Sequence, residues 1–107
     1  MSTLSTHVLD AVRGAPAAGV GVRLDRDGDL VAEATTDADG RIGRLGPPEL
    51  AAGTYRLTFA TGAYFAALGQ PTFYPQVQIT FTVGEPEQHY HVPVLLSPFA
   101  YSTYRGS

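Results

Sequence analysis

Short runs in which apolar and polar residues alternate are the feature of this sequence that most constrains its fold. Apolar side chains occupy every second position in residues 20–24, 55–59 and 77–83. A period of two gives a β-strand one apolar face, whereas an amphipathic helix needs a period near 3.6. The Asp27-Gly28-Asp29 segment separates the first run from the next, and Asp-Gly is typical of a hairpin turn. The sequence therefore predicts an all-β fold.

We expect one domain over residues 1–107, with about eight strands and one short helix in two packed antiparallel sheets. Further turn signals separate the runs at a spacing close to that of a β-sandwich. The only helical segment is predicted at residues 62–68, where Gly69 and Pro71 would end it.

The composition excludes several classes of function. The chain has no cysteine, so it can form neither a disulfide nor a thiolate zinc site, and it has no cysteine nucleophile. Its formal net charge is −3 and its basic residues form no cluster, which argues against a nucleic-acid or anionic-membrane partner and favours a small molecule. No apolar run reaches the ~18 residues of a membrane span, and the start of the sequence lacks the pattern of an export signal. We therefore expect a cytoplasmic location.

Two histidines, His89 and His91, are two positions apart in a segment that we expect to be a strand. The period of a strand puts both on one face, and Tyr90 and Val92 then lie on the apolar face that forms the core. The histidines therefore point away from the core. They could be a solvated surface pair, part of a metal site that needs further ligands, or groups for proton transfer near neutral pH.

The sequence has neither a complete calcium-binding loop nor the nucleophile elbow of a serine hydrolase. The Asp37-Ala38-Asp39-Gly40 segment resembles the start of a calcium loop but lacks the later acidic ligands, so we expect a turn. No Gly-x-Ser-x-Gly elbow is present, so any hydrolysis would proceed by direct attack of water. Arg41 follows the turn and is either a solvated strand residue or a planar donor for an anionic or carbonyl-rich ligand.

The final segment, residues 101–107, is rich in hydrogen-bonding groups. Five of its seven residues carry a hydroxyl and one carries a guanidinium. Chain ends are usually frayed, and a frayed end has no need of so many such groups. We therefore expect this tail (residues 101–107) to be docked and to form part of a site.

Taken together, several segments resemble one family. The most specific are His-Tyr-His-Val-Pro at residues 89–93 and Tyr-Arg-Gly-Ser at 104–107; the others are residues 5–10, 36–42, 62–65, 73–75, 96–98 and 101–103. They resemble the 5-hydroxyisourate hydrolases, the transthyretin-related enzymes of urate breakdown, over essentially the whole chain. The hormone-carrying transthyretins have Lys, Glu and Thr where this chain has His7, Arg41 and His91, so the resemblance favours an enzyme over a carrier.

The resemblance implies a transthyretin-like sandwich assembled as a homotetramer, a dimer of dimers, with the site between two-fold-related subunits. In this sequence His7 and His91 would polarise and deprotonate the attacking water. Arg41 would bind substrate oxygens and oppose the developing negative charge, while Tyr104 and Ser107 would orient the substrate and the water. The substrate would be 5-hydroxyisourate, hydrolysed at a cyclic amide bond, and neither a cofactor nor a metal is implied.

Two other functions remain open from the sequence. Residues 16–24 with the following turn also resemble the start of structural prealbumin-like sandwich modules, which have no catalysis. The second alternative is a transthyretin-like carrier of small molecules. The carrier would bind an aromatic ligand without turning over 5-hydroxyisourate.

Overall fold

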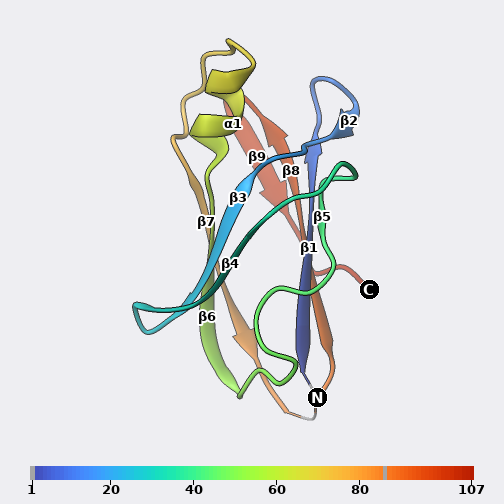
Figure 1. The fold of residues 1–107 in the computed structure, drawn as a ribbon, viewed down its shortest axis with the longest axis vertical. Helices are drawn as coiled ribbons and strands as arrows, with labels where there is room; N and C mark the ends of the chain where they lie inside the picture. Colours follow the sequence, from blue (N-terminus) through green and yellow to red (C-terminus); the bar gives the residue numbers. More distant parts are fainter. Residues whose placement is uncertain (1, 86) are drawn as a thin grey trace.

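Two β-sheets stack face to face in the computed structural model, which describes residues 2–85 and 87–107 (Figure 1). One sheet, here the β1–β8 sheet, has the order β2-β1-β8-β9, and the short β5 also pairs with β1. The other, the β3–β6 sheet, has the order β4-β3-β6-β7. The elements are β1 Thr3–Asp10, β2 Ala15–Pro16, β3 Gly21–Arg26, β4 Asp29–Thr35, β5 Arg41–Ile42, β6 Gly53–Phe59, α1 Thr61–Ala67, β7 Val77–Val83, β8 His89–Ser97 and β9 Ala100–Thr103.

The core lies between the sheets and is built from the alternating residues of the strands. In β6 the side chains of Tyr55, Leu57 and Phe59 are buried, whereas Arg56 between them is exposed. The same alternation buries the core-facing apolar residues of β3 and β8. Alternation therefore sets which side of each strand faces outward, and this decides where the polar side chains of the site lie.

The hairpin predicted at Asp27-Gly28 is confirmed. These two residues connect β3 to β4, and both have positive φ angles, 53° and 84°. A two-residue loop with two positive φ angles has the twist that antiparallel neighbours require.

The helix predicted for residues 62–68 is also present, shifted by one position to Thr61–Ala67. It lies at one end of the sandwich (Figure 1) and buries Tyr64 and Phe65. Its end is the predicted one: Gly69 has a φ of 68°, and the amide of Gln70 donates to the carbonyl of Phe65. This is the bond of a glycine-terminated helix.

The strand pairs are antiparallel with the exception of β1 and β8, which run parallel with Ser5 opposite His91 and His7 opposite Pro93. Because the chain builds the whole β3–β6 sheet between these two strands, no hairpin fixes their relative direction. A second feature that the sequence analysis did not foresee is the reversal at Pro98 and Phe99. It turns part of the tail into the edge strand β9.

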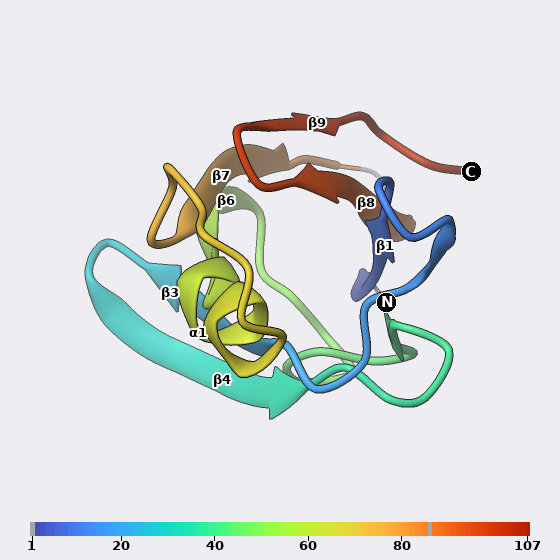
Figure 2. The same cartoon turned by 90° about the horizontal axis from the view of Figure 1, so that it is seen from above.

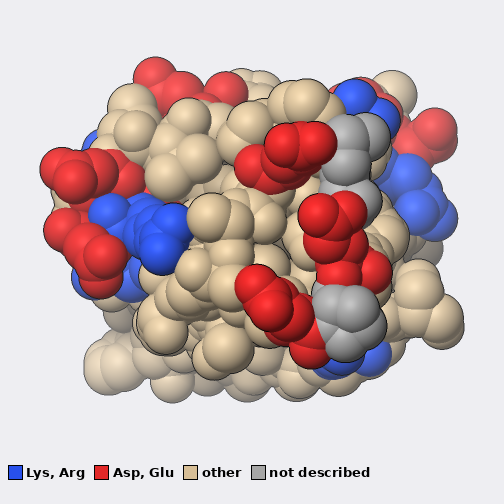
Figure 3. Space-filling model, turned by 90° about the horizontal axis from the view of Figure 1, so that it is seen from below, with Lys and Arg blue, Asp and Glu red and all other residues tan. Residues whose placement is uncertain are grey.

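At the end of the molecule seen in Figure 3, Asp and Glu side chains form two groups with an uncharged area between them, and Arg side chains lie among or beside both groups. In the part of the chain that the structure describes, no helix is long and apolar enough to cross a membrane.

Candidate active site

Three neighbouring strands place Arg41, His7 and His91 on the outer face of the β1–β8 sheet. Arg41 of β5 lies opposite His7 of β1, and His91 of β8 lies opposite Ser5, two residues before His7. The predicted outward direction of His89 and His91 is confirmed, since Tyr90 between them and Val92 after them are buried. The structure thus brings together three of the five predicted site residues.

The predicted turn before Arg41 holds that residue in place. One carboxylate oxygen of Asp37 accepts hydrogen bonds from the amides of Asp39 and Arg41, both at 2.9 Å. The carbonyl of Arg41 accepts a further bond from the amide of Asp37. Because the Asp37 carboxylate is used in this way, it serves the turn, as an Asx residue commonly does.

Gly40 attaches the same turn to the sheet. Its carbonyl accepts a 2.7 Å hydrogen bond from the amide of Val8. Its φ is 74°, and a side chain there would overlap the carbonyl oxygen of Val8. Only glycine allows both the conformation and the close approach, so this residue fixes the distance between the Arg41 segment and β1.

His7 is oriented by the turn as well. Its Nε2 lies 2.9 Å from the carbonyl oxygen of Asp39. A carbonyl can only accept, so Nε2 carries the hydrogen and donates. In the neutral ring Nδ1 is then the nitrogen with the lone pair, able to accept a proton.

His91 is connected to His89 by a serine hydroxyl. The Oγ of Ser5 lies 2.7 Å from Nδ1 of His91 and 2.8 Å from Nε2 of His89. Nδ1 of His89 in turn lies 2.6 Å from Oγ1 of Thr3. Because Nδ1 of His91 is in contact with Ser5, Nε2 is the ring nitrogen that is left to accept a proton. The hydroxyl residues of this series, Thr3 and Ser5, were not predicted as parts of the site from the sequence.

The surroundings of His91 favour its neutral form. Partial burial lowers the pKa of His91 below the ordinary value, and the positive charge of Arg41 lowers it further. His7 and His89 act in the same direction, while a hydrogen bond with the backbone of Ser5 opposes them. A neutral imidazole can accept a proton, so His91 suits the role of a base.

The tail is docked on β8, as predicted. After β9 the amide of Gly106 donates to the carbonyl of His91 at 2.9 Å, and a Cβ on Gly106 would lie 2.5 Å from Cδ2 of the His91 ring. Arg105 lies over the ring of Tyr90 and donates to Gln88. Ser107 follows directly, and the end of the chain runs across the outer side of β8 toward β1 (Figure 2).

Tyr104 lines a groove to which one of the two site histidines, His91, also contributes. Its side chain is 59% exposed, and the groove, of about 300 Å³, is also lined by Ile79, Phe81 and Val92. This groove lies between the edge strands β7 and β9.

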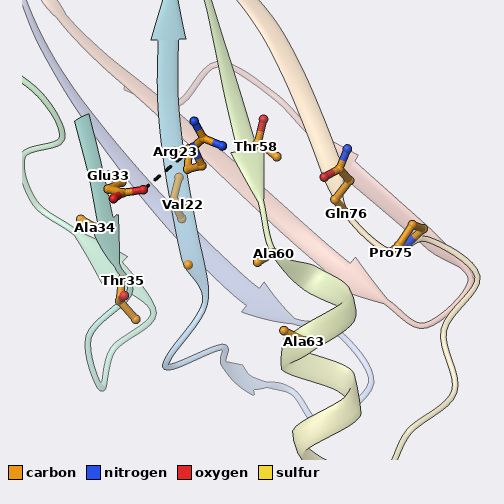
Figure 4. Close-up of a pocket in the computed structure, with 11 residues that line it drawn as sticks. Val22, Arg23, Glu33, Ala34, Thr35, Thr58, Ala60, Ala63, Pro75 and Gln76 are labelled. Carbon is orange, nitrogen blue, oxygen red and sulfur yellow. Dashed lines mark ion pairs between the residues drawn. The ribbon is translucent and has the colours of Figure 1, made fainter. Parts of the chain in front are cut away.

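A wider hollow of about 620 Å³ lies on the other sheet and brings no comparable chemistry together. Figure 4 shows that residues of β3, β4 and β6 line it together with Ala63 of α1 and the Pro75-Gln76 segment before β7. Arg23 and Glu33, its two charged residues, face each other at 3.9 Å and are both largely exposed. A solvent-exposed ion pair of this kind contributes little interaction energy.

No metal centre is formed among residues 2–85 and 87–107, where no group of three His, Cys, Asp or Glu side chains is placed to hold an ion. Three residues that contact the site histidines, Ser5, Asp39 and Gly106, could not be assigned to them from the sequence. Two of them contact a histidine through their backbone, which no side-chain pattern reveals, and Ser5 does so only through the parallel register.

Comparison with known proteins identifies the family of this chain. A model of the HIUase/Transthyretin family matches residues 4–106. The 5-hydroxyisourate hydrolase of Caulobacter vibrioides is 52% identical over 115 residues, covering 100% of both chains. The solved 5-hydroxyisourate hydrolase of Klebsiella pneumoniae is 47% identical, with a TM-score of 0.94 and coverage of 100% of this chain and 94% of that one. Sea bream transthyretin, solved in complex with thyroxine, is 35% identical with a TM-score of 0.89, covering 96% of this chain and 93% of that one. The chain belongs to the HIUase/Transthyretin family.

Proposed function

We propose that this protein hydrolyses 5-hydroxyisourate, opening its six-membered ring at a cyclic amide bond to give 2-oxo-4-hydroxy-4-carboxy-5-ureidoimidazoline. The observation that carries the proposal is the placement of Arg41, His7 and His91 on one sheet face, with the docked tail against His91. The relatives named 5-hydroxyisourate hydrolase match this chain over its full length. The proposed reaction uses no cofactor and no metal.

His91 is the proposed base. Its Nδ1 is occupied by Ser5, so Nε2 would take a proton from water as the water oxygen bonds to the carbonyl carbon. His7, with Nε2 fixed on Asp39, would help to polarise the same water through Nδ1. The proton on Nε2 of His91 would then pass to the leaving nitrogen as the C–N bond breaks.

Arg41 is the proposed electrostatic group. When water attacks a cyclic amide, negative charge develops on the carbonyl oxygen. The guanidinium of Arg41 presents planar donors and a permanent positive charge beside the histidines, and its backbone is held by the turn. Such a preorganised donor stabilises the transition state more than the substrate.

The end of the tail would orient the reactants. Ser107 follows the residue that contacts the His91 ring, and a hydroxyl or a carboxylate there can accept a hydrogen bond from water. Tyr104 lines a groove to which His91 also contributes, and its exposed ring would contact the substrate from there.

We further propose a homotetramer, a dimer of dimers. The edge strands β7 and β9 border the apolar groove lined by Ile79 and Phe81, and pairing with a second copy would satisfy both edges. Leu9 and Leu95 lie opposite each other beside the histidines on the outer face, where two dimers would meet and enclose the site. The proposed location is the cytoplasm.

The decisive experiment adds the purified protein to 5-hydroxyisourate freshly made by urate oxidase and follows the ultraviolet band of the substrate. We expect the band to decay faster with protein than without it, in chelator as well as in plain buffer. Binding of an aromatic ligand without faster decay would instead select a carrier.

A further inference from the structure

We propose that Ser5 and His89 form a proton relay that takes positive charge from His91 during water attack and returns it for the leaving nitrogen. The inference rests on the proposed hydrolysis with His91 as its base. Ser5 and His89 act only through His91, so both are positioning residues rather than groups that contact the substrate.

The geometry of the relay follows from the parallel register. Thr3 lies opposite His89 and Ser5 lies opposite His91, so two short hydroxyl side chains alternate with two imidazoles on one face. The contacts run without a break from Oγ1 of Thr3 to His89, then to Oγ of Ser5 and to Nδ1 of His91, all between 2.6 and 2.8 Å.

The single hydroxyl hydrogen of Ser5 couples the two rings. It can be donated to one ring while the oxygen accepts a hydrogen from the other. When Ser5 donates to Nε2 of His89, Nδ1 of His91 must carry a hydrogen, and Nε2 of His91 is left as a base. The hydrogen on Nδ1 of His89 is then donated to Thr3. With the hydrogens in these positions, His91 can activate water.

The transfer conserves every proton. Water gives a proton to Nε2 of His91 as its oxygen bonds to the carbonyl carbon. The hydrogen on Nδ1 of His91 moves to Oγ of Ser5, and the Ser5 hydrogen moves to Nε2 of His89, which becomes an imidazolium. When the C–N bond breaks, both hydrogens move back and the proton on Nε2 of His91 goes to the leaving nitrogen.

The difference between the two ring environments gives the relay its direction. His91 is half-buried and lies in the field of Arg41 and His7, whereas His89 is exposed to solvent. A positive charge is better solvated at the exposed ring and lies farther from the cation of β5. The relay would thus lower the cost of forming an imidazolium at the site.

Two variants separate a relay from a simple hydrogen-bond support. His89→Gln keeps a polar group that can reach Ser5 but cannot take a proton near neutral pH. His89→Ala leaves room at an exposed position, where free imidazole in the buffer can replace the missing ring. We expect both to lower kcat by about tenfold with KM within twofold, a smaller loss than removing the base itself. Imidazole should raise the kcat of His89→Ala with increasing concentration and leave the wild type unchanged.

Ser5 gives a second, independent test. Ser5→Ala should lower kcat as His89→Gln does, and Ser5→Thr, which keeps the hydroxyl, should restore it. Thr54→Val, which removes an exposed hydroxyl from the other sheet, is the control variant. Thermal unfolding of every variant shows whether the fold is kept. A wild-type kcat in His89→Gln, or a loss in His89→Ala that imidazole does not change, would overturn the relay. If the wild-type protein itself fails to accelerate decay of 5-hydroxyisourate, the proposed function fails instead.

Discussion

Gly106 lies against the imidazole of His91. Its amide donates to the His91 carbonyl at 2.9 Å, and a Cβ at this position would lie 2.5 Å from Cδ2 of the ring. No side chain fits between the two residues. The end of the tail and the proposed base therefore share one space, and a change in either residue displaces the other.

Gly106→Ala should test this contact directly. The added methyl must move either the His91 ring or the tail, so we expect kcat to fall by about tenfold or more, because small displacements of reacting groups are costly. Gly43→Ala is the matched control, since a Cβ there meets nothing within 4 Å. The measurement is a steady-state assay of both variants together with their melting curves. A fully active Gly106→Ala protein would contradict the close contact.

Deleting residues 105–107 should separate catalysis from stability. The deletion removes the bond of Arg105 to Gln88, its contact with Tyr90 and the Gly106 bridge. Arg105 is itself exposed, so we expect the free energy of unfolding to fall by only about 1 kcal/mol. Turnover should fall by about tenfold or more, because the group that positions the reactants is lost. Wild-type turnover in the truncated protein would show that the tail is structural.

His7→Asn, His91→Asn and Arg41→Ala should each lower kcat/KM by about 10²-fold or more while the fold is kept, which is the usual effect of losing a general base or a charge-stabilising group. Arg23→Ala is the control, because Arg23 is an exposed arginine paired with Glu33 on the other sheet. Circular dichroism should show the same β content in all four proteins. A larger loss in His89→Asn than in His91→Asn would reverse the assignment of the base.

The dependence of the rate on pH should report His91. The base must be neutral, so kcat/KM should fall as the pH decreases through its pKa. Burial first, and then the charges of Arg41, His7 and His89, hold that pKa below the ordinary value of a histidine, so the acid limb should lie below it too. In Arg41→Ala the limb of the residual activity should move to higher pH, whereas Arg41→Lys should leave it in place. An acid limb above the ordinary histidine value would contradict the environment described here.

Leu95→Asp should test the proposed assembly. Leu95 lies on the outer face opposite Leu9, where two dimers would meet, and a carboxylate there would have to be desolvated. We expect light scattering to show loss of the tetramer together with loss of activity. Glu33→Gln, a change on the outer face of the other sheet, should alter neither. An active wild-type monomer would refute a site between subunits.

Much of the fold could be predicted because most strands alternate cleanly. β1 is harder to recognise, since its core-facing positions include Thr6 and Asp10 as well as Leu4 and Val8. Both polar residues are buried with partners: Thr6 donates to the carbonyl of Val92, and Asp10 accepts from Tyr64. A pattern read from hydropathy cannot detect such pairs. β9 is missed for a different reason, because all four of its residues are exposed.

The candidate site could also be predicted only in part from the sequence. The period of a strand was sufficient to place His89 and His91 on one outward face, and that prediction is confirmed. The contacts that orient their rings depend on which residue of β1 stands opposite each histidine. That register is a property of the folded sheet, so Ser5 could not be assigned from its place in the sequence.

The parallel pairing of β1 with β8 also bears on how the molecule folds. It joins segments more than eighty positions apart, and such distant pairings make folding slow, because a long loop must close before its contacts form. His7 and His91 come from these two strands, so the site does not exist until this late step is complete. Recovery of turnover during refolding therefore marks the final closure of the sandwich rather than the appearance of β-structure.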